Sequence, residues 1–382
     1  MKKVMFMING LSGGGAEQIL QTLLVHLNYD KYDVTVYSMH RENIAQMNYP
    51  KEIHYKVVFD EYNGNGKIYQ KIGKIYTKVK RKIFQIFPSA VFYRLFIHEK
   101  YDVEIAFIEG ESTKIVSGSS NKYSKKYAWV HIDLMENPWT NFLYESNEDE
   151  ANHYKKFDRI LCVSQAVKAS FLKKFDTIES TKVQVQYNPI DRNKIMAMSK
   201  EEYPLKEKKK IRMVAVGRLV RQKGFDRLLN VCLRLQQKGY KFELFILGDG
   251  HERKNLENII ESLNLSRTVF LLGYFSNPYA VMNTADLLVC SSRAEGFSTV
   301  LAEGVVLGVP ILSTECAGVQ ELFGDMKCGI IVENNTESLY QGLKLILDDP
   351  VQLEIYKRNS FERGKMFTLS KAVAEIEQLL DE

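Results

Sequence analysis

Short apolar runs alternate with amphipathic segments along almost the whole chain, and this alternation restricts the possible folds. In the first half the apolar runs lie at 3–9, 33–38, 102–107, 127–131 and 159–163, with helical periodicity at 16–27 and 165–174. In the second half they lie at 211–216, 242–247, 269–272, 286–290, 310–312 and 329–332, with helical periodicity at 226–237 and 252–263. Strands that are apolar throughout are typical of parallel sheets covered by helices on both faces. The pattern predicts an α/β fold with doubly wound sheets.

The length of 382 residues exceeds what one hydrophobic core usually supports, so we expect two domains. The segment Asn-Pro-Ile-Asp at 188–191, followed by a lysine-rich stretch at 206–210, marks the boundary. We therefore predict domains at 1–188 and 189–363, and a helix at about 362–380 after the last strand. In doubly wound domains the ligands bind at the carboxyl ends of the strands, which places the expected site in a cleft between the two domains.

The cysteine pattern and the N-terminus exclude several classes of protein. Five cysteines are scattered along the chain without a C-x-x-C pair, which argues against a disulfide framework and a zinc site. The N-terminal apolar run is too short for the core of a signal peptide, and no run approaches 18 apolar residues. We therefore expect a cytoplasmic protein without a membrane-spanning helix.

The segment SSRAEGFSTVLAEGVVLGVP, residues 291–310, carries the strongest functional signal. Glu295 precedes a bend at Gly296, and Glu303 lies in a predicted helix at 299–307. A helix that begins near Ser298 directs free backbone N–H groups and the positive end of its dipole at whatever lies in front of it. One carboxylate beside an anion site and a second about two turns along the helix suit a sugar nucleotide.

This segment resembles the E-x7-E motif of the retaining family-4 glycosyltransferases, which have the GT-B fold of two Rossmann-like domains facing a cleft. The segment GRLVRQKGFDRLL at 217–229 and the N-terminal GGGAE at 13–17 are also similar to segments of that family. The resemblance extends from the start of the chain to about residue 330. It implies that the first domain binds the acceptor, that the second binds the nucleotide sugar, and that the C-terminal helix, 364–382, packs back on the first domain.

The resemblance implies a role for several residues of the second domain. Arg218 and Lys223 would hold the donor diphosphate and stabilise it as it leaves, while Arg221 is a spectator. Glu303 would accept hydrogen bonds from the ribose hydroxyls, and Glu295 from the transferred sugar. Backbone groups would contact the rest of the donor, at Gly296, Phe297, Ser298 and Thr299 for the sugar and phosphates and at Gly273 and Tyr274 for the base.

In the first domain, Gly14 and Gly15 belong to a turn where the backbone can approach a ligand closely. The turn lacks the dinucleotide fingerprint G-x-G-x-x-G, because Gln18 stands where the third glycine would be. By resemblance this turn contacts the diphosphate and the acceptor, and His131 meets the transferred sugar. Asp133 and Glu111 are further polar candidates on the same rim. Each of these residues also has a purely structural interpretation: a tight turn, a core histidine or a first-turn acid.

The chain contains no D-x-D, the motif with which the other large glycosyltransferase fold holds a metal ion. We therefore expect no metal and no cofactor apart from the donor substrate. The nucleobase is not evident from these residues, and a uridine diphosphate donor follows from the resemblance alone.

A separate segment, 67–87, has an apolar residue every three or four positions, and lysines beside that face at Lys67, Lys71, Lys74, Lys78 and Lys82. No acid occurs from 62 to 98. This composition is typical of a helix at an anionic membrane surface. The alternative is a helix that packs between domains with a solvated basic face. Nucleic acid is not expected, because no base-reading motif accompanies the charge.

These observations predict a metal-independent retaining hexosyltransferase, peripheral at the inner face of the membrane. It would move a hexose from a nucleotide sugar to a lipid-linked or membrane-proximal saccharide in surface polysaccharide synthesis. Two alternatives remain at this stage: a sugar-nucleotide epimerase on the same fold, and a non-catalytic protein that binds membranes or nucleic acid.

Overall fold

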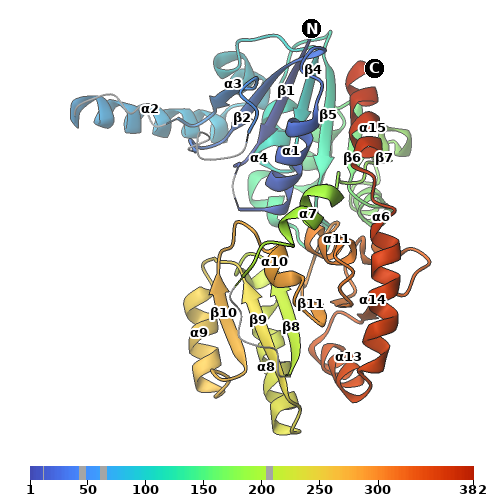
Figure 1. The fold of residues 1–382 in the computed structure, drawn as a ribbon. Helices are drawn as coiled ribbons and strands as arrows, with labels where there is room; N and C mark the ends of the chain where they lie inside the picture. Colours follow the sequence, from blue (N-terminus) through green and yellow to red (C-terminus); the bar gives the residue numbers. More distant parts are fainter. Residues whose placement is uncertain (12, 43–48, 61–66, 204–209) are drawn as a thin grey trace. The chain divides into compact units, whose positions relative to one another are not determined.

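The computed structural model describes residues 1–11, 13–42, 49–60, 67–203 and 210–382, with the backbone alone for 67–74. The chain divides into two compact units. The first comprises Met1–Pro189 and Ser370–Glu382, and the second comprises Ile190–Leu369. Each unit contains one parallel sheet with helices packed on it (Figure 1), so the predicted α/β class is confirmed.

Within the described part of the first unit, seven parallel strands form one sheet in the order β3-β2-β1-β4-β5-β6-β7. The strands are β1 (Lys2–Ile8), β2 (Tyr32–Ser38), β3 (His54–Val57), β4 (Val103–Ala106), β5 (Lys125–Val130), β6 (Arg159–Cys162) and β7 (Val183–Val185). The helices are α1 (Gly15–His26), α2 (Lys67–Ile86), α3 (Ser89–Phe96), α4 (Glu111–Val116), α5 (Asn147–Tyr154), α6 (Gln165–Lys174) and α15 (Leu369–Asp381), with short 3-10 turns η2 (Trp139–Leu143) and η3 (Ser180–Lys182).

Strand β1 lies in the middle of this sheet because its side chains are apolar on both faces. Its residues from Val4 to Ile8 are fully buried. The chain leaves β1 toward β2 and β3 on one side and returns to β4 on the other. This reversal leaves the carboxyl end of β1 open to a ligand, and the glycine turn that contains Gly14 and Gly15 begins there.

Over the described residues of the second unit, six parallel strands form a sheet in the order β10-β9-β8-β11-β12-β13. The strands are β8 (Ile211–Val216), β9 (Phe242–Leu247), β10 (Val269–Gly273), β11 (Leu287–Cys290), β12 (Ile311–Thr314) and β13 (Gly329–Val332). The helices are α7 (Arg192–Met198), α8 (Phe225–Gln237), α9 (Arg253–Ser262), α10 (Tyr279–Met282), α11 (Thr299–Val306), α12 (Val319–Phe323), α13 (Thr336–Asp348) and α14 (Val351–Gly364), with the 3-10 turn η4 (Arg221–Lys223). Here the order reverses between β8 and β11.

The C-terminal segment differs from the single helix predicted at about 362–380. Helix α14 ends at Gly364, and α15 begins only at Leu369. Glycine is a poor helix former, and at this position a Cβ atom would lie 2.7 Å from the Val305 carbonyl oxygen. The close approach of α14 to α11 therefore requires glycine at the point where the helix stops.

Helix α15 packs on the sheet of the first unit, although the second unit, Ile190–Leu369, separates it in the chain from the rest of the first unit. The Tyr127 hydroxyl donates to the Leu379 carbonyl at 3.0 Å, and the Lys2 ammonium donates to the Leu380 carbonyl at 2.6 Å. The apolar face of α15 is buried at Val373, Ile376, Leu379 and Leu380. The last helix is therefore part of the first unit's core.

Candidate active site

The predicted helix at 299–307 is confirmed as α11, and its first turn has the expected cap. The Ser298 hydroxyl accepts a hydrogen bond from the backbone N–H of Leu301. A serine cap leaves other first-turn N–H groups available to a ligand. The segment that leads into the helix is buried, with Glu295, Phe297 and Ser298 each less than a tenth exposed.

Lys223 and Glu295, which are 72 positions apart in the sequence, form an ion pair. The Lys223 Nζ lies 2.6 Å from the Glu295 Oε1, and the Ser292 hydroxyl donates to the same oxygen at 2.5 Å. Burial, the largest single influence, lowers the pKa of Lys223, but the charge and hydrogen bond of Glu295 together with Cys290 raise it, and the net pKa lies above its ordinary value. The ammonium is therefore charged at neutral pH, and two residues assigned to the diphosphate and the sugar lie together.

Further contacts hold the segment after β8 against the segment after β11. The Arg293 guanidinium makes two hydrogen bonds of 2.8 Å to the Asp226 carboxylate and one of 2.7 Å to the Arg221 carbonyl. Gly224, with φ +66°, permits the approach, because a Cβ there would lie 2.0 Å from the Ser291 carbonyl oxygen. These contacts fix the backbone on which Lys223 and Glu295 are mounted.

Buried Arg227 is a positioning residue that the sequence analysis did not identify. Its guanidinium donates to the carbonyls of Ser291 at 2.9 Å and Ser292 at 2.6 Å, and to the Asn334 side chain at 2.7 Å. An arginine in an amphipathic helix is normally expected on the face that contacts solvent. The signal that could have identified it is its place in the first turn of α8, directly after the Lys223 loop.

Glu303 is buried in α11, and its carboxylate accepts a hydrogen bond of 3.1 Å from the Tyr279 hydroxyl. Burial raises the pKa of Glu303 to about 7, although the Tyr279 hydrogen bond and the charge of Lys194 oppose this rise. Tyr279, which begins the short helix α10, was not among the site residues predicted from the sequence. Protonated and ionised Glu303 are therefore both populated near neutral pH.

The remaining donor-site candidates of the second unit lie at the carboxyl edge of its sheet. Arg218 follows β8 and is exposed, and its charge acts on Lys223. Gly273 ends β10 with φ +85°, and Tyr274 follows it with 69% of its surface exposed. Thr299 begins α11 and Gly296 is buried in the preceding bend. The structure thus gathers the residues after β8, β10 and β11 at one edge.

In the first unit, Gly14 is the residue before α1, and Gly15 begins that helix. The His131 ring packs against Phe107 and Trp129, with centroids 5.1 and 6.0 Å away. Burial lowers the pKa of His131 to about 3, so the ring is neutral at physiological pH. Its Nε2 is buried and has no hydrogen-bond partner among the described residues. A neutral ring with one open nitrogen can bind a hydroxyl but cannot offset a charge.

The two other rim candidates differ in their surroundings. The Asp133 Oδ1 accepts backbone N–H groups of Met135 at 2.9 Å and Glu136 at 3.2 Å, so this carboxylate holds its own turn. Glu111 begins α4, and burial raises its pKa. Glu109, which the sequence analysis did not identify, is buried, and its carboxylate accepts the backbone N–H of His131 at 3.0 Å. Glu109 therefore holds the backbone of the candidate histidine.

The predicted basic helix is present as α2. The side chains of Lys67, Lys71 and Lys74 lie outside the described part of the structure, whereas Lys78 and Lys82 are exposed. The side of α2 that packs on the unit carries Thr77, Lys80 and Phe84. Among the regularly spaced apolar residues whose side chains are described, Ile75 is 54% exposed, Val79 52% and Ile86 63%, while Ile83 is half-buried.

Among the described residues, no group of three or more His, Cys, Asp or Glu side chains is arranged to hold a metal ion. In the same part of the chain, none of the helices combines the length and the apolar character needed to cross a bilayer.

Comparison with known proteins identifies the class of protein that this fold and site define. Residues 199–363 match the family model described as glycosyl transferases group 1. The matched segment lies in the second unit, the chain has the GT-B fold, and the resemblance to the family-4 enzymes is confirmed. The reaction class predicted from the sequence, a hexosyltransferase, is confirmed as well.

Two relatives from Campylobacter jejuni align over nearly the whole chain. One is the N-acetylgalactosamine-N,N'-diacetylbacillosaminyl-diphospho-undecaprenol 4-alpha-N-acetylgalactosaminyltransferase, 29% identical over 96% of both chains. The other is the GalNAc-alpha-(1->4)-GalNAc-alpha-(1->3)-diNAcBac-PP-undecaprenol alpha-1,4-N-acetyl-D-galactosaminyltransferase, 26% identical over 100% of this chain and 99% of that one. Among solved structures, Anabaena Alr3699/HepE in complex with UDP and glucose is similar over 100% of both chains, with a TM-score of 0.77 at 18% identity.

Proposed function

We propose that this protein transfers a hexose from a uridine diphosphate sugar, with retention of configuration, to a saccharide carried on a polyprenyl diphosphate. The observation that carries the proposal is the Lys223–Glu295 pair in front of the Ser298 cap of α11. A fixed ammonium and free helix N–H groups suit a diphosphate, and an adjacent carboxylate suits sugar hydroxyls. Glu303, farther along the same helix, suits the ribose.

The proposed chemistry needs no enzymic nucleophile. The bond from the anomeric carbon to the donor phosphate oxygen breaks, and a bond to the acceptor oxygen forms on the same face of the sugar. The acceptor's hydroxyl proton moves to the departing phosphate oxygen. Lys223, Arg218 and the first turn of α11 stabilise the negative charge that develops there. Because protein groups supply the positive charge that offsets this negative charge, the reaction proceeds without a metal ion.

The acceptor class follows from the relatives rather than from the site. Both Campylobacter jejuni enzymes are named for acceptors in which a saccharide is joined through a diphosphate to undecaprenol. An acceptor with a polyprenyl tail stays in the bilayer, so the enzyme must reach it at the membrane surface. We accordingly place the protein at the inner face of the membrane, where it contributes to a bacterial surface polysaccharide.

The exposed face of α2 and α3 supports membrane contact. Ile75, Val79 and Ile86 face solvent on α2, and Val91 and Leu95 continue the apolar surface on α3. Exposed cations flank this surface at Lys78, Lys82 and Arg94, and no acid occurs from 62 to 98. An apolar face flanked by cations complements an anionic lipid surface better than a solvated domain contact.

The test is a reconstituted transfer reaction. The purified protein is incubated with a panel of nucleotide sugars and undecaprenyl-diphosphate-linked saccharides, and the product linkage is determined by NMR. We expect a product of retained anomeric configuration, formed at the same rate in EDTA, and its loss in Lys223→Ala. Inversion would overturn the proposed stereochemistry. Conversion of the donor without acceptor would indicate an epimerase, and lipid binding without any turnover would indicate a non-catalytic protein.

A further inference from the structure

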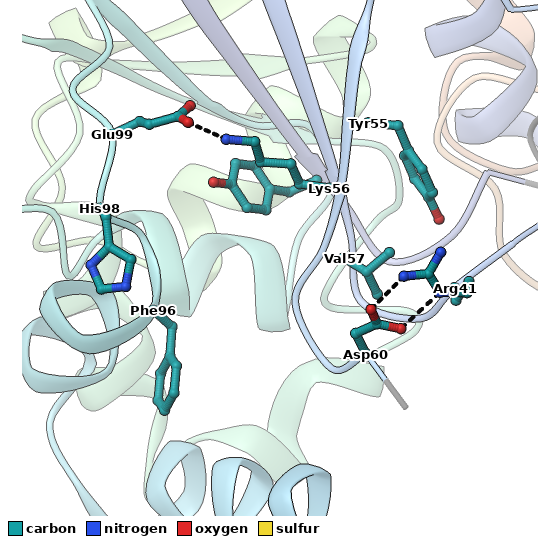
Figure 2. A pocket seen from close by; sticks show the side chains of 9 residues that line it. Arg41, Tyr55, Lys56, Val57, Asp60, Phe96, His98 and Glu99 are labelled. Carbon is teal, nitrogen blue, oxygen red and sulfur yellow. Dashed lines mark hydrogen bonds and ion pairs between the residues drawn. The ribbon is translucent and has the colours of Figure 1, made fainter. Parts of the chain in front are cut away.

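A pocket of about 410 Å3 lies against the edge strand of the first sheet, and none of the residues assigned to the reaction lines it (Figure 2). Strand β3 and the segments on either side of it supply one wall, and the end of α3 supplies the other. Its lining residues are Tyr37, Arg41, Tyr55, Lys56, Val57, Asp60, Phe96, His98 and Glu99. Tyr37 of this lining lies on β2, the strand next to β1, which leads to the glycine turn. Its volume falls in the range of about 300–1,000 Å3 typical of small-molecule sites.

The charged groups of this pocket are paired with one another. The Arg41 Nε donates to the Asp60 Oδ1 at 2.8 Å, and the Lys56 ammonium pairs with the Glu99 carboxylate. The Tyr101 hydroxyl also donates to Glu99, at 2.7 Å. Hydrogen bonds from Lys56 and Tyr101 lower the pKa of Glu99, and the hydrogen bond to Asp60 raises the pKa of Arg41, so Glu99 and Arg41 are charged at neutral pH.

The paired lining favours a neutral ligand with many hydroxyls. The charges of Arg41, Lys56, Asp60 and Glu99 sum to zero, so a phosphate gains no net attraction. Each pair is partly exposed, with side-chain exposures of 57% and 34% for Arg41 and Asp60. Guanidinium and ammonium N–H groups and carboxylate oxygens therefore remain available as donors and acceptors fixed in place by their partners.

Aromatic and apolar side chains complete the lining of the pocket. Figure 2 shows Phe96 on the side of His98, and Tyr55 and Val57 on the side of Arg41. The faces of a sugar ring carry C–H bonds and its rim carries hydroxyls. Aromatic rings bury the C–H faces, while paired charges bind the rim. A phosphate or a metal ion gains no stabilisation from contact with aromatic and apolar side chains.

We propose that this pocket is a saccharide-binding subsite for a neutral mono- or disaccharide unit of the acceptor glycan, separate from the site of transfer. The proposal rests on the proposed function only for the origin of the saccharide. Binding here would hold the growing chain on the first unit while its terminal hydroxyl reacts elsewhere, which raises the effective concentration of the acceptor.

Direct binding to the full-length protein tests this proposal without donor. The methyl α-glycosides of N-acetylgalactosamine, N-acetylglucosamine and galactose, and their α-linked disaccharides, are titrated and followed by saturation-transfer NMR. We expect at least one saccharide to bind in the wild type. We expect binding at least tenfold weaker in Val57→Phe, which fills the pocket, and in Glu99→Gln, which breaks one pair. Lys344→Ala, which removes a similarly exposed pair with Asp348 in the second unit, is the matched control.

Several outcomes would overturn the proposal. These are no saccharide bound by the wild type, equal binding in Val57→Phe and wild type, or displacement of the saccharide by inorganic pyrophosphate. Because Glu99 is exposed, Glu99→Gln keeps the fold and decides the question if Val57→Phe fails to fold. UDP titrated in parallel separates this proposal from the proposed function. Saccharide binding without UDP binding would contradict only the proposed transfer from a uridine diphosphate sugar. UDP binding without saccharide binding would contradict only the proposed saccharide subsite.

Discussion

At the scale of single residues, the Lys223–Glu295 pair holds an ammonium charged and in place before any donor arrives. An unpaired lysine at this position would lose solvation without compensation, and burial alone would lower its pKa. With Glu295 at 2.6 Å the charge is retained. Under the proposed function, a donor diphosphate would therefore meet a preorganised cation, and the Glu295 carboxylate would accept sugar hydroxyls.

The first prediction concerns this cation. Lys223→Met keeps the apolar stem but removes the charge, so the departing diphosphate loses one fixed donor. We expect kcat to fall by about 10²- to 10³-fold, the loss typical of removing one donor that stabilises developing negative charge in an active site. Lys238→Met, at an exposed position at the end of α8, is the control for nonspecific effects of the change. Steady-state kinetics that give equal kcat for the two variants would contradict the assignment.

The second prediction concerns Glu303, whose pKa burial raises to about 7. Only the ionised carboxylate accepts hydrogen bonds from both ribose hydroxyls, so donor affinity should rise as the pH increases through 7 and be lost below it. The Tyr279 hydrogen bond favours the ionised form. Tyr279→Phe should therefore raise the pKa further and move the midpoint of the affinity profile to higher pH.

Isothermal titration of UDP between pH 6 and pH 8.5 measures this midpoint. A role of Tyr279 in folding alone would weaken binding equally at every pH and leave the midpoint unchanged. Glu303→Gln, which does not titrate, should bind weakly with a flat profile. A flat profile in the wild type would show that Glu303 ionisation does not govern donor binding.

The assignment of roles to Lys223 and Glu295 from the sequence depended on motif resemblance, and the structure adds their contact. Arg227 and Tyr279 could not be identified from sequence, for a physical reason. In the sequence pattern, an arginine in an amphipathic helix and a tyrosine after a proline cannot be distinguished from ordinary surface residues. Their roles come from contacts with residues 64 and 24 positions away, which depend on how the strands are ordered.

At the scale of elements, the apolar strands were predictable because a central parallel strand is buried on both faces. Strands β3 and β7 were not predicted. The first has the sequence His-Tyr-Lys-Val and lies at a sheet edge, and the second has only three residues, so neither contains a continuous apolar run. The periodicity of α2 correctly indicated a helix. It could not indicate which face packs, and the packed face is the one with Thr77, Lys80 and Phe84.

The third prediction concerns the surface of α2 that faces solvent. Lysines near an anionic membrane contribute about 1 kcal/mol each. Removing two of them with Lys78→Ala and Lys82→Ala should cost about 2 kcal/mol, which is about a 30-fold weaker partition coefficient. Flotation with vesicles that contain an anionic lipid measures this change.

The control is the pair Lys238→Ala and Lys254→Ala, which removes the same charge from exposed positions on α8 and α9. Vesicles of neutral lipid should bind wild type and both variants equally weakly. If both double variants float as well as the wild type, the basic face of α2 does not contact the membrane through its charge.

At the scale of the whole molecule, the first unit is discontinuous in the chain. Its sheet is formed by the first 189 residues, but α15, which completes its core, follows the entire second unit. The bond from the Tyr127 hydroxyl to the Leu379 carbonyl spans 252 positions. Contacts of such long range form late in folding, because a large loop must close first. The first unit therefore reaches its full stability only when the last helix docks.

The last prediction tests this dependence. Ile376 is 1% exposed in α15, and Ile376→Ala should lower the free energy of unfolding of the first unit by about 2–5 kcal/mol. Hydrogen exchange should accelerate in β1 and β5 and remain unchanged in β8 and β9, because the lost contacts belong to the first sheet. Leu345→Ala in α13, where the side chain is 60% exposed, should change stability by less than about 0.5 kcal/mol. Unchanged exchange in β1 and β5 of Ile376→Ala would mean that α15 contributes little to the first core.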